Sequence, residues 1–376
     1  MDFTFSEEQY EFRDAIREFL RGEVTPDSIR ARWESETGMD PALWPKLVEM
    51  GMTAMLVPEA QGGLGLGPLD MVMLAHECGR FAVPEPIVVQ SLSAVPLLVD
   101  ALASGANGRQ AQVEAVLTKI AAGEAMVLVG HPGNPVINFA SQADHLLLSH
   151  GDEVHLVPVT EVTIRNRKSL DPSRRVGEVS WTHSSTHCIA SGKTGADLWR
   201  STLNRGALGA AAQLLGLAEA MVQQAVAYSC DREQFGKPIG SNQAVKHLMA
   251  DCAVRIEYAK PVLHRAAYAI EVAPLRADPA VSHAKVACAE AASLSARNSI
   301  QTFGAMGYTW ECDLQMFAKR AWVLEKNWGD SGFHKNRIHE WLVNPRALVG
   351  AEYTFGSRAA GHGSQSLAPP VLEVVR

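Results

Sequence analysis

The chain lacks the features of several simple protein classes. Its 376 residues contain only six cysteines, at 78, 188, 230, 252, 288 and 312, without a CxxC pair or a Cys/His group at zinc-ligand spacing. We therefore expect reduced, mostly buried thiols, no disulfide and no metal site. No uninterrupted apolar run approaches the roughly 20 residues that a bilayer span requires, so no membrane span is predicted.

An excess of positive charge is also missing. The 34 basic and 41 acidic residues give a net charge of -7, and basic pairs such as Arg174-Arg175 and Lys319-Arg320 are scattered rather than gathered in a stripe. Nucleic acid is therefore not an expected partner. The N-terminus, MDFTFSEEQYEFRD, is acidic and amphipathic where a secretory signal is basic and then apolar, which predicts a cytoplasmic protein.

The pattern of the first third of the chain is helical. Ser6 followed by Gln9 forms a capping-box sequence at the start of the first helix. The loop PEAQGGLGLGP, residues 58–68, interrupts the helical pattern, which then resumes. We predict an N-terminal helical domain over residues 1–122.

Two further regions follow. Residues 123–195 hold short β-branched runs, MVLVG, HLLLS, EVHLVPV and VGEVSW, which predict a small β domain. Residues 196–350 return to helical spacing, with small Ala and Ser residues that allow close packing, and predict a C-terminal four-helix bundle. Residues 351–376 are rich in Gly, Ser and Pro and predict a flexible tail. The expected fold class is mainly α with an inserted, truncated β domain.

Common catalytic motifs are missing from the sequence. Gly63, Gly65 and Gly67 invite comparison with a dinucleotide fingerprint, but the third glycine falls too early and Pro68 follows it, so an interhelical turn is favoured. The sequence has no HExxH motif, no GxSxG elbow and no P-loop. Metal-dependent hydrolysis, nucleophile-elbow chemistry and P-loop phosphoryl transfer therefore lose support.

Two motifs in the predicted bundle remain. In DREQFGKPIG, Arg232 ends a helix and Phe235 and Gly236 form a turn, and a guanidinium beside an aromatic ring and a glycine backbone suits an adenine diphosphate. In QTFGAMGYTWE, which begins at Gln301, a helix breaks at two glycines. Taken alone, each motif fits an ordinary helix end better than a ligand site.

Together and in this order, the two motifs resemble the acyl-CoA dehydrogenase family, whose members use FAD to desaturate acyl-CoA thioesters. The resemblance covers about residues 1–345 and includes SEEQYEFRDAIREFL, LWPKLVEMGM and PEAQGGLGLG. It implies that the chain binds the ADP half of FAD across a subunit interface. The residues that the resemblance assigns to this contact are Arg232, Phe235 and Gln301, with Gly236, Gln243 and Gly304 beside them.

The sequence departs from the family at the catalytic base. Family members remove the α-proton of the thioester with a glutamate, and a hydride then passes to the flavin. The first family position for this glutamate holds Trp328, and the second, before an arginine in the first bundle helix, holds Asn204. Neither side chain accepts a proton at neutral pH. Asp330 and Glu325 are the remaining candidates for a relocated base.

The β region departs as well. Catalytic members carry a TEPxxGSD-like segment and strands that contact the flavin ring, whereas this chain has GHPGNP, residues 130–135, and a shortened connection to the next strand. The pattern resembles the degenerate subunit of bacterial heteromeric acyl-CoA dehydrogenases of steroid side-chain breakdown. That resemblance implies an α2β2 assembly in which this chain completes the flavin site of a motif-complete partner.

Three hypotheses stay open at this point. The chain is a subunit that works only with a catalytic partner, a homomeric acyl-CoA dehydrogenase with a relocated base, or a flavin-free scaffold or acyl-CoA-binding protein. The resemblance implies FAD as cofactor, acyl-CoA as ligand and a role in lipid or steroid catabolism, and it allows an electron-transfer flavoprotein as a further partner.

Overall fold

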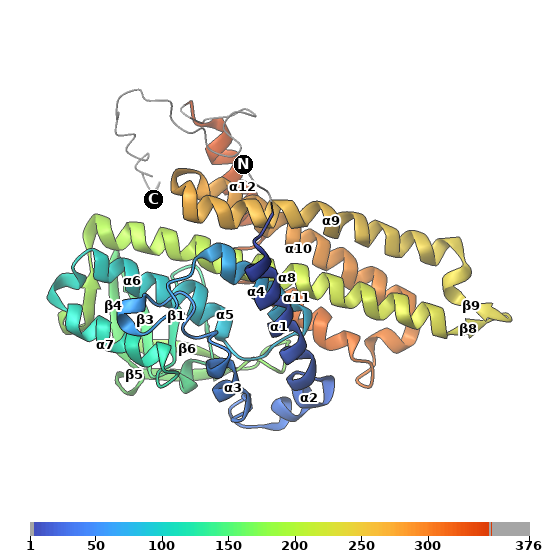
Figure 1. The fold of residues 1–376 in the computed structure, drawn as a ribbon, viewed down its shortest axis with the longest axis horizontal. Coiled ribbons are helices and arrows are strands. Elements are labelled where there is room, and N and C mark those ends of the chain that lie inside the picture. The colour runs from blue at the N-terminus through green and yellow to red at the C-terminus, as the bar shows by residue number, and fades with distance from the viewer. Residues whose placement is uncertain (1–3, 346, 348–376) are drawn as a thin grey trace.

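Helices form the N-terminal and C-terminal parts of the chain, and a small β region lies between them in the sequence. In the folded chain the strands of this region lie on one side, beside α6 (Val95–Ala103) and α7 (Gln110–Ala121) (Figure 1). The computed structural model describes residues 4–345 and residue 347. The predicted fold class, mainly α with an inserted small β domain, is confirmed. The predicted tail, 351–376, lies outside the described residues. No helix in the described part of the chain has the length and apolar character that a membrane span needs.

The N-terminal region is a set of helices that begins as the sequence predicts. Ser6 caps the first helix, because its Oγ accepts a hydrogen bond from Gln9 N (3.2 Å) while Gln9 Oε1 accepts one from Ser6 N (2.9 Å). Such caps stabilise a helix by about 1 kcal/mol. The helices are α1 (Glu7–Glu23), α2 (Pro26–Glu34), α3 (Leu43–Glu49), α4 (Pro68–Arg80), α5 (Ile87–Val89), the π-helical turn η2 (Gln90–Ala94), α6 (Val95–Ala103) and α7 (Gln110–Ala121).

The β region consists of two small sheets. A four-stranded sheet has the order β1-β3-β4-β7 and a three-stranded sheet has the order β2-β6-β5. Gln90 of η2 fastens the first strand to the helices, because its buried Oε1 accepts a hydrogen bond from Val127 N at 2.9 Å. The strands are β1 (Val127–Gly130), β2 (Ile137–Asn138), β3 (His145–His150), β4 (Glu153–Pro158), β5 (Val162–Arg167), β6 (Val176–Trp181) and β7 (Cys188–Ala190).

Long alanine-rich helices form the C-terminal bundle. Small residues let them approach closely: a Cβ at Gly216 of α8 would lie 2.0 Å from the backbone oxygen of His76 in α4. The closest contact between α4 and α8 therefore requires glycine. The helices are α8 (Gly192–Asp231), α9 (Gln243–Val272), α10 (Ala277–Phe303), α11 (Leu314–Lys326) and α12 (Ser331–Val343).

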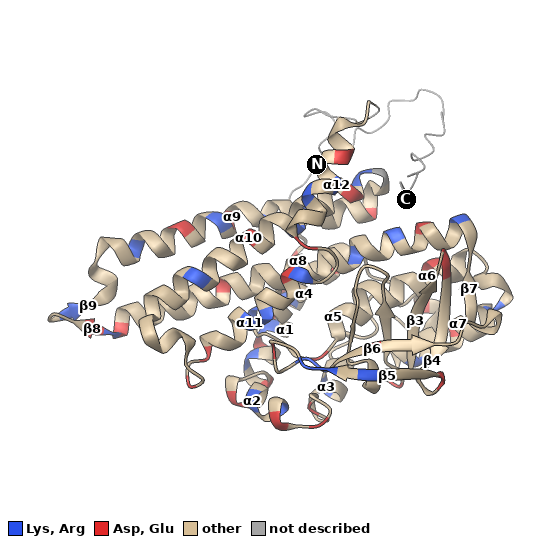
Figure 2. Cartoon of the chain, turned by 180° about the vertical axis from the view of Figure 1, so that it is seen from behind, with Lys and Arg blue, Asp and Glu red and all other residues tan. Residues whose placement is uncertain are grey.

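Basic and acidic residues are interspersed along these helices (Figure 2).

The helix α7 ends at Ala121 and α8 begins at Gly192. We keep the division of the chain at 122/123, 195/196 and 350/351 as a proposal.

Candidate functional site

A short hairpin projects from one end of the bundle, between α8 and α9 (Figure 1). It consists of β8 (Glu233–Gln234) and β9 (Lys237–Pro238), joined by Phe235 and Gly236. Both turn residues have positive φ, 53° and 76°, as a two-residue hairpin with a tight turn requires. The sequence motif built around Arg232 is thus a rigid turn at the surface.

Within the described part of the chain, the side chains of Arg232, Phe235 and Gln243 make no hydrogen bond or ion pair. Phe235 is 100% exposed, and Arg232 and Gln243 are also exposed. Among the described residues, no hydrogen bond or ion pair engages the Arg232 guanidinium. A fully exposed phenylalanine beside a free guanidinium is unusual for a surface turn and is suited to a ligand or partner that covers both.

The second motif lies at the same end of the bundle. Gln301 is exposed in the last turn of α10, and Gly304 follows the helix with φ 65° and ψ −141°. The rings of Tyr228, near the end of α8, and Phe303, at the end of α10, stack at 4.3 Å with 14° between their planes. This stack holds the two helix ends together, so that the two motifs face solvent side by side.

The two family positions for the base also come together, at a different place. Trp328 is 3% exposed, and its ring lies directly on α8: a Cβ at Gly206 would fall 2.2 Å from the Cδ2 atom of Trp328. Gly206 is two residues beyond Asn204. An indole therefore packs beside the position where a second branch of the family carries its glutamate.

The backbone of Trp328 is held in an unfavourable conformation. Its φ is 60°, which is rare for a bulky residue and costs on the order of 1–3 kcal/mol. Three contacts fix it: Trp328 N donates to Asn134 Oδ1 (2.8 Å), Trp328 O lies 2.9 Å from His334 Nε2, and the neighbouring Gly329 O accepts from Lys285 Nζ at 3.1 Å. The surrounding structure is thus built to keep the indole in place.

Burial changes the ionisation of the residues behind this loop. It lowers the pKa of Lys285 to about 8 and that of His334 to about 4. Lys285 Nζ donates to Glu325 O at 2.8 Å as well as to Gly329 O, so its role here is to fasten the loop. Lys285 and His334 could not be predicted from the sequence, because nothing in the local pattern of α10 or α12 indicates that they contact this loop.

The segment GHPGNP, which the resemblance aligns with the flavin-contacting segment of the family, packs on the same indole. The His131 ring lies 5.5 Å from the Trp328 ring and 5.7 Å from the Trp199 ring. Burial lowers the pKa of His131 to about 4, so this imidazole is neutral at pH 7. His131 and Asn134 therefore support Trp328.

Asn204 takes part in an ionic cluster. Its Nδ2 donates to Asp278 Oδ1 (2.6 Å) and its Oδ1 accepts from Arg337 Nη2 (3.0 Å). Burial raises the pKa of Asp278, but Arg337 and Arg200 outweigh this effect and the net shift is downward. Asp278 thus places a carboxylate beside Asn204. The sequence alone does not predict this contact, because Asp278 lies in α10 and Asn204 in α8.

The two candidates for a relocated base have structural contacts. Asp330 caps α12, where its Oδ1 accepts a hydrogen bond from Phe333 N at 2.9 Å, and this bond lowers the pKa of the carboxyl. Glu325 pairs with Lys326 at 3.3 Å. Neither contact indicates a proton acceptor matched to neutral pH.

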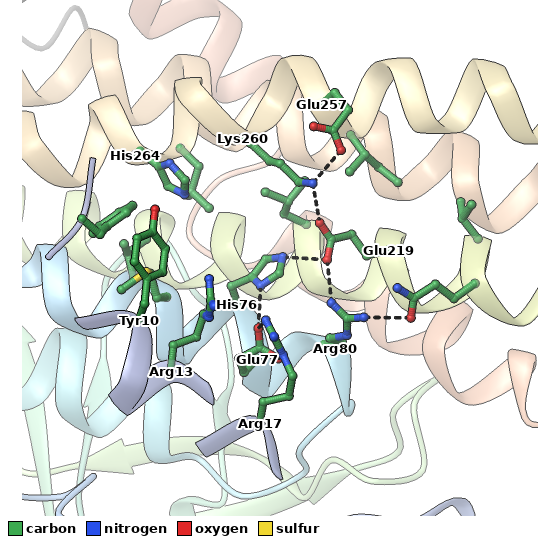
Figure 3. A pocket seen from close by; sticks show the side chains of 18 of the residues that line it. Tyr10, Arg13, Arg17, His76, Glu77, Arg80, Glu219, Glu257, Lys260 and His264 are labelled. Carbon is green, nitrogen blue, oxygen red and sulfur yellow. Dashed lines mark hydrogen bonds and ion pairs between the residues drawn. The ribbon is translucent and has the colours of Figure 1, made fainter. Parts of the chain in front are cut away.

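A separate cavity of about 480 Å³ lies among α1, α4, α8 and α9 (Figure 3). Two carboxylates organise it. Arg17 Nη2 lies 2.6 Å from Glu77 Oε1, and His76 bridges Glu77 (3.4 Å) and Glu219 (3.3 Å). Burial raises the pKa of both glutamates, but their cationic neighbours lower each to about 2. None of its lining residues belongs to the loop around Trp328 or to the β region.

The structure places the residues expected to bind the ADP half of FAD at the exposed end of the bundle. The exposed guanidinium of Arg232, the aromatic ring of Phe235 and the amide of Gln301 suit an ADP group. The residues that the resemblance assigns to the flavin-ring half suit a flavin less well, because the rings of His131 and Trp328 pack on each other there.

Comparisons with known proteins match both helical regions. Residues 6–124 match the acyl-CoA dehydrogenase N-terminal domain and residues 193–343 match its C-terminal domain. Acyl-CoA dehydrogenase IpdE2 of Mycolicibacterium smegmatis is 32% identical over 320 residues, which cover 84% of this chain and 93% of that protein. Acyl-CoA dehydrogenase FadE34 of Mycobacterium tuberculosis is 30% identical over 374 residues, 93% of this chain but 49% of that protein.

Solved structures share the fold. The ChsE4-ChsE5 complex from Mycobacterium tuberculosis includes a chain with a TM-score of 0.80 and 24% identity, covering 92% of this chain and 99% of that chain. The Tcur3481-Tcur3483 steroid ACAD gives a TM-score of 0.77 at 23% identity, with 89% and 97% covered. With relatives above 30% identity over most of its length, this chain belongs to the acyl-CoA dehydrogenase family.

Proposed function

We propose that this chain is a subunit of an FAD-dependent acyl-CoA dehydrogenase and supplies the ADP-binding half of the FAD site to a catalytic partner. One contrast carries the proposal: the residues for the ADP half are exposed and unpartnered, whereas Trp328 fills the place of the family base and is 3% exposed. A chain that retained its own catalysis would need a carboxylate free to accept a proton there.

The proposed roles follow from geometry. When bound, FAD supplies the hydride acceptor of the desaturation. Arg232 would donate to the pyrophosphate, Phe235 would cover the adenosine portion, and Gln301 would hydrogen-bond to the same ADP group from α10. Gly236, Gln243 and Gly304 shape the backbone around these side chains. The general base would come from the partner.

The comparisons support a heteromeric assembly. Two of the structures similar to this chain are pairs of different polypeptides, ChsE4-ChsE5 and Tcur3481-Tcur3483, and the second is described as a steroid ACAD. We propose an α2β2 arrangement, acting on the acyl-CoA thioester of a lipid or steroid side chain in the cytoplasm, with an electron-transfer flavoprotein as a candidate acceptor.

A second candidate, a homomeric enzyme with its own base, has one observation in its favour. Asp278 Oδ1 accepts a hydrogen bond from Asn204 Nδ2 at 2.6 Å, so this carboxylate lies beside one of the two proposed base positions. The Asp278 carboxylate is paired with Arg337 and Arg200, and its pKa is lowered, so it is a weak base. A flavin-free scaffold is the third candidate.

Flavin content separates the three. The chain would be purified alone and after co-expression with a motif-complete family member, and the flavin absorbance per chain and the molar mass would be measured. We expect a yellow heteromer and a colourless single chain. A yellow protein from this chain alone would favour the homomeric enzyme, and colourless protein in both preparations would favour the scaffold.

A further inference from the structure

Four side chains with metal-binding atoms converge at one end of the β region. His150 ends β3, Glu153 begins β4, His155 follows in the same strand, and His183 comes two residues after β6. The first three belong to one hairpin, in which His150 pairs with Glu153. His183 arrives from the other sheet. The cluster thus joins the two sheets of the β region.

The three imidazoles converge on a single carboxylate oxygen. Glu153 Oε2 lies 2.9 Å from His155 Nε2, 2.9 Å from His183 Nε2 and 3.4 Å from His150 Nδ1. A carboxylate has about four lone-pair sites over its two oxygens, so one oxygen is not expected to accept three good hydrogen bonds. A cation placed among these atoms resolves the crowding.

The spacing suits a small divalent ion. One ligand atom each from His150, Glu153 and His183 lies within 4.8 Å of the other two. Tetrahedral zinc with bonds of about 2.0–2.1 Å to nitrogen needs ligand atoms about 3.3 Å apart, so small side-chain rotations would close the site. The His150 and His183 rings are already stacked at 4.0 Å, with 27° between their planes.

The buried side of the cluster provides an independent observation. His155 is 0% exposed, and its Nδ1 is buried without a hydrogen-bond partner. With Glu153 and Cys188 it forms a second group whose ligand atoms also lie within 4.8 Å of one another. The other ring nitrogen of His155, Nε2, lies 2.9 Å from Glu153 Oε2, so His155 contacts the carboxylate from its buried side.

We propose that His150, Glu153 and His183 bind a divalent transition-metal ion, with Zn²⁺ as the preferred ion, and that His155 positions Glu153 from the buried side. Two imidazoles and a carboxylate form a borderline donor set that zinc binds well. Three protein ligands leave one position for water. No residue of the proposed FAD site takes part.

The position of the site indicates a structural role. Trp199 of α8 donates its Nε1 hydrogen to Glu153 O at 3.0 Å, and His131 packs on Trp199. An ion at Glu153 would therefore stiffen the β region beside the bundle. The sequence predicts no metal site, because the usual motifs are absent and 27 residues separate His183 from the H-x2-E-x-H segment.

Metal binding by the full chain tests the proposal. The protein would be stripped with a chelator, titrated calorimetrically with ZnCl₂ and scanned for thermal unfolding. We expect one bound equivalent and a higher Tm with zinc. The variants H150A and H183A should each bind zinc at least about 10-fold more weakly. Loss of a residue that only supports a metal ligand already costs about 10–100-fold in metal affinity.

A matched control is available in the same region. His187 pairs with Glu161 at 2.9 Å, as His183 pairs with Glu153, but it lies outside the cluster. H187A should bind zinc like the unmodified chain. The d–d spectrum of bound Co²⁺ gives a readout on the unmodified chain that does not depend on how the variants fold. The proposal would be overturned if the H150A/H183A double variant bound zinc as tightly as the unmodified chain. It would also be overturned if H187A lost as much zinc affinity as H150A and H183A, or if bound Co²⁺ gave no tetrahedral spectrum.

Discussion

The indole of Trp328 lies on the backbone of Gly206, so closely that a Cβ at Gly206 would be 2.2 Å from the ring. The relationship links the loop after α11 to the first long helix of the bundle. The family resemblance assigns a base position to each element. One holds an aromatic ring, and the other, Asn204, holds an amide whose nitrogen and oxygen are both hydrogen-bonded.

The contact predicts the effect of adding a methyl group. Gly206→Ala should lower the free energy of unfolding by about 1–3 kcal/mol, because the indole has no room to move away. Urea unfolding would measure the loss. Gly22→Ala is the matched control, since no atom lies within 4 Å of its added Cβ and alanine favours the helix by up to about 1 kcal/mol.

A double-mutant cycle identifies the clashing group. In a Trp328→Ala background, Gly206→Ala should cost less than in the unmodified chain, because the ring is gone. Equal costs in the two backgrounds would mean that the indole does not rest on α8 as described.

Arg232→Ala should weaken FAD retention in the assembled complex. A charge-assisted hydrogen bond to pyrophosphate contributes about 1.5–3 kcal/mol, which corresponds to roughly a 10- to 100-fold rise in Kd. Flavin release on dilution would measure it. Since Arg232 is exposed and its guanidinium makes no hydrogen bond or ion pair with the described residues, the fold should be unaffected. Arg21→Ala, which removes an exposed arginine paired with Glu18, serves as control. Unchanged flavin affinity would leave Arg232 as a plain helix-end residue.

Removing the remaining carboxylates should have little effect on turnover. Asp330→Asn, Glu325→Gln and Asp278→Asn should each leave the rate of the assembled enzyme within about a factor of three, whereas loss of a true general base costs on the order of 10²–10⁴. Turnover would be measured with an acyl-CoA and an artificial electron acceptor. A hundredfold drop in one variant, with FAD still bound, would place catalysis in this chain.

The buried carboxylates beside the cavity predict acid sensitivity. The folded-state pKa values of Glu77 and Glu219 are about 2, below the ordinary 4.5, so their stabilising contribution is complete above pH 4.5 and is lost as the pH falls toward 2. His76 acts in the opposite direction: Glu219 and Glu77 raise its pKa against the effect of burial, so its contribution is lost as the pH rises through that value.

Urea unfolding at a series of pH values would reveal this window. In Glu77→Gln, the slope between pH 2 and 4.5 should decrease, and stability at pH 7 should fall by about 2–3 kcal/mol, less than the 3–5 typical of a fully buried pair because Arg17 is 26% exposed. Glu18→Gln, at an exposed surface pair, should alter neither quantity appreciably. An unchanged acid slope in Glu77→Gln would show that other groups control acid unfolding.

Local patterns were sufficient for the succession of helical, β and helical regions, for the capping box at Ser6 and for the two motifs, because caps, turns and periodicity depend on neighbouring residues. The assignment of Trp328 and Asn204 to positions without a base came from the family resemblance instead. The short strands β2 and β7 and the strand β5, with the sequence VTIRNR, were not predicted.

Only the folded chain brings Trp328 onto Gly206, Asp278 beside Asn204, and Lys285 under the loop. Each pair joins elements far apart in sequence, and a periodic pattern shows that a residue is buried but not what it meets. His183 and Glu153 are a further example: they lie far apart in the sequence, but the packing of the two sheets brings His183 Nε2 to 2.9 Å from Glu153 Oε2. Contacts between distant segments depend on how the helices and sheets pack, which local preference leaves undetermined.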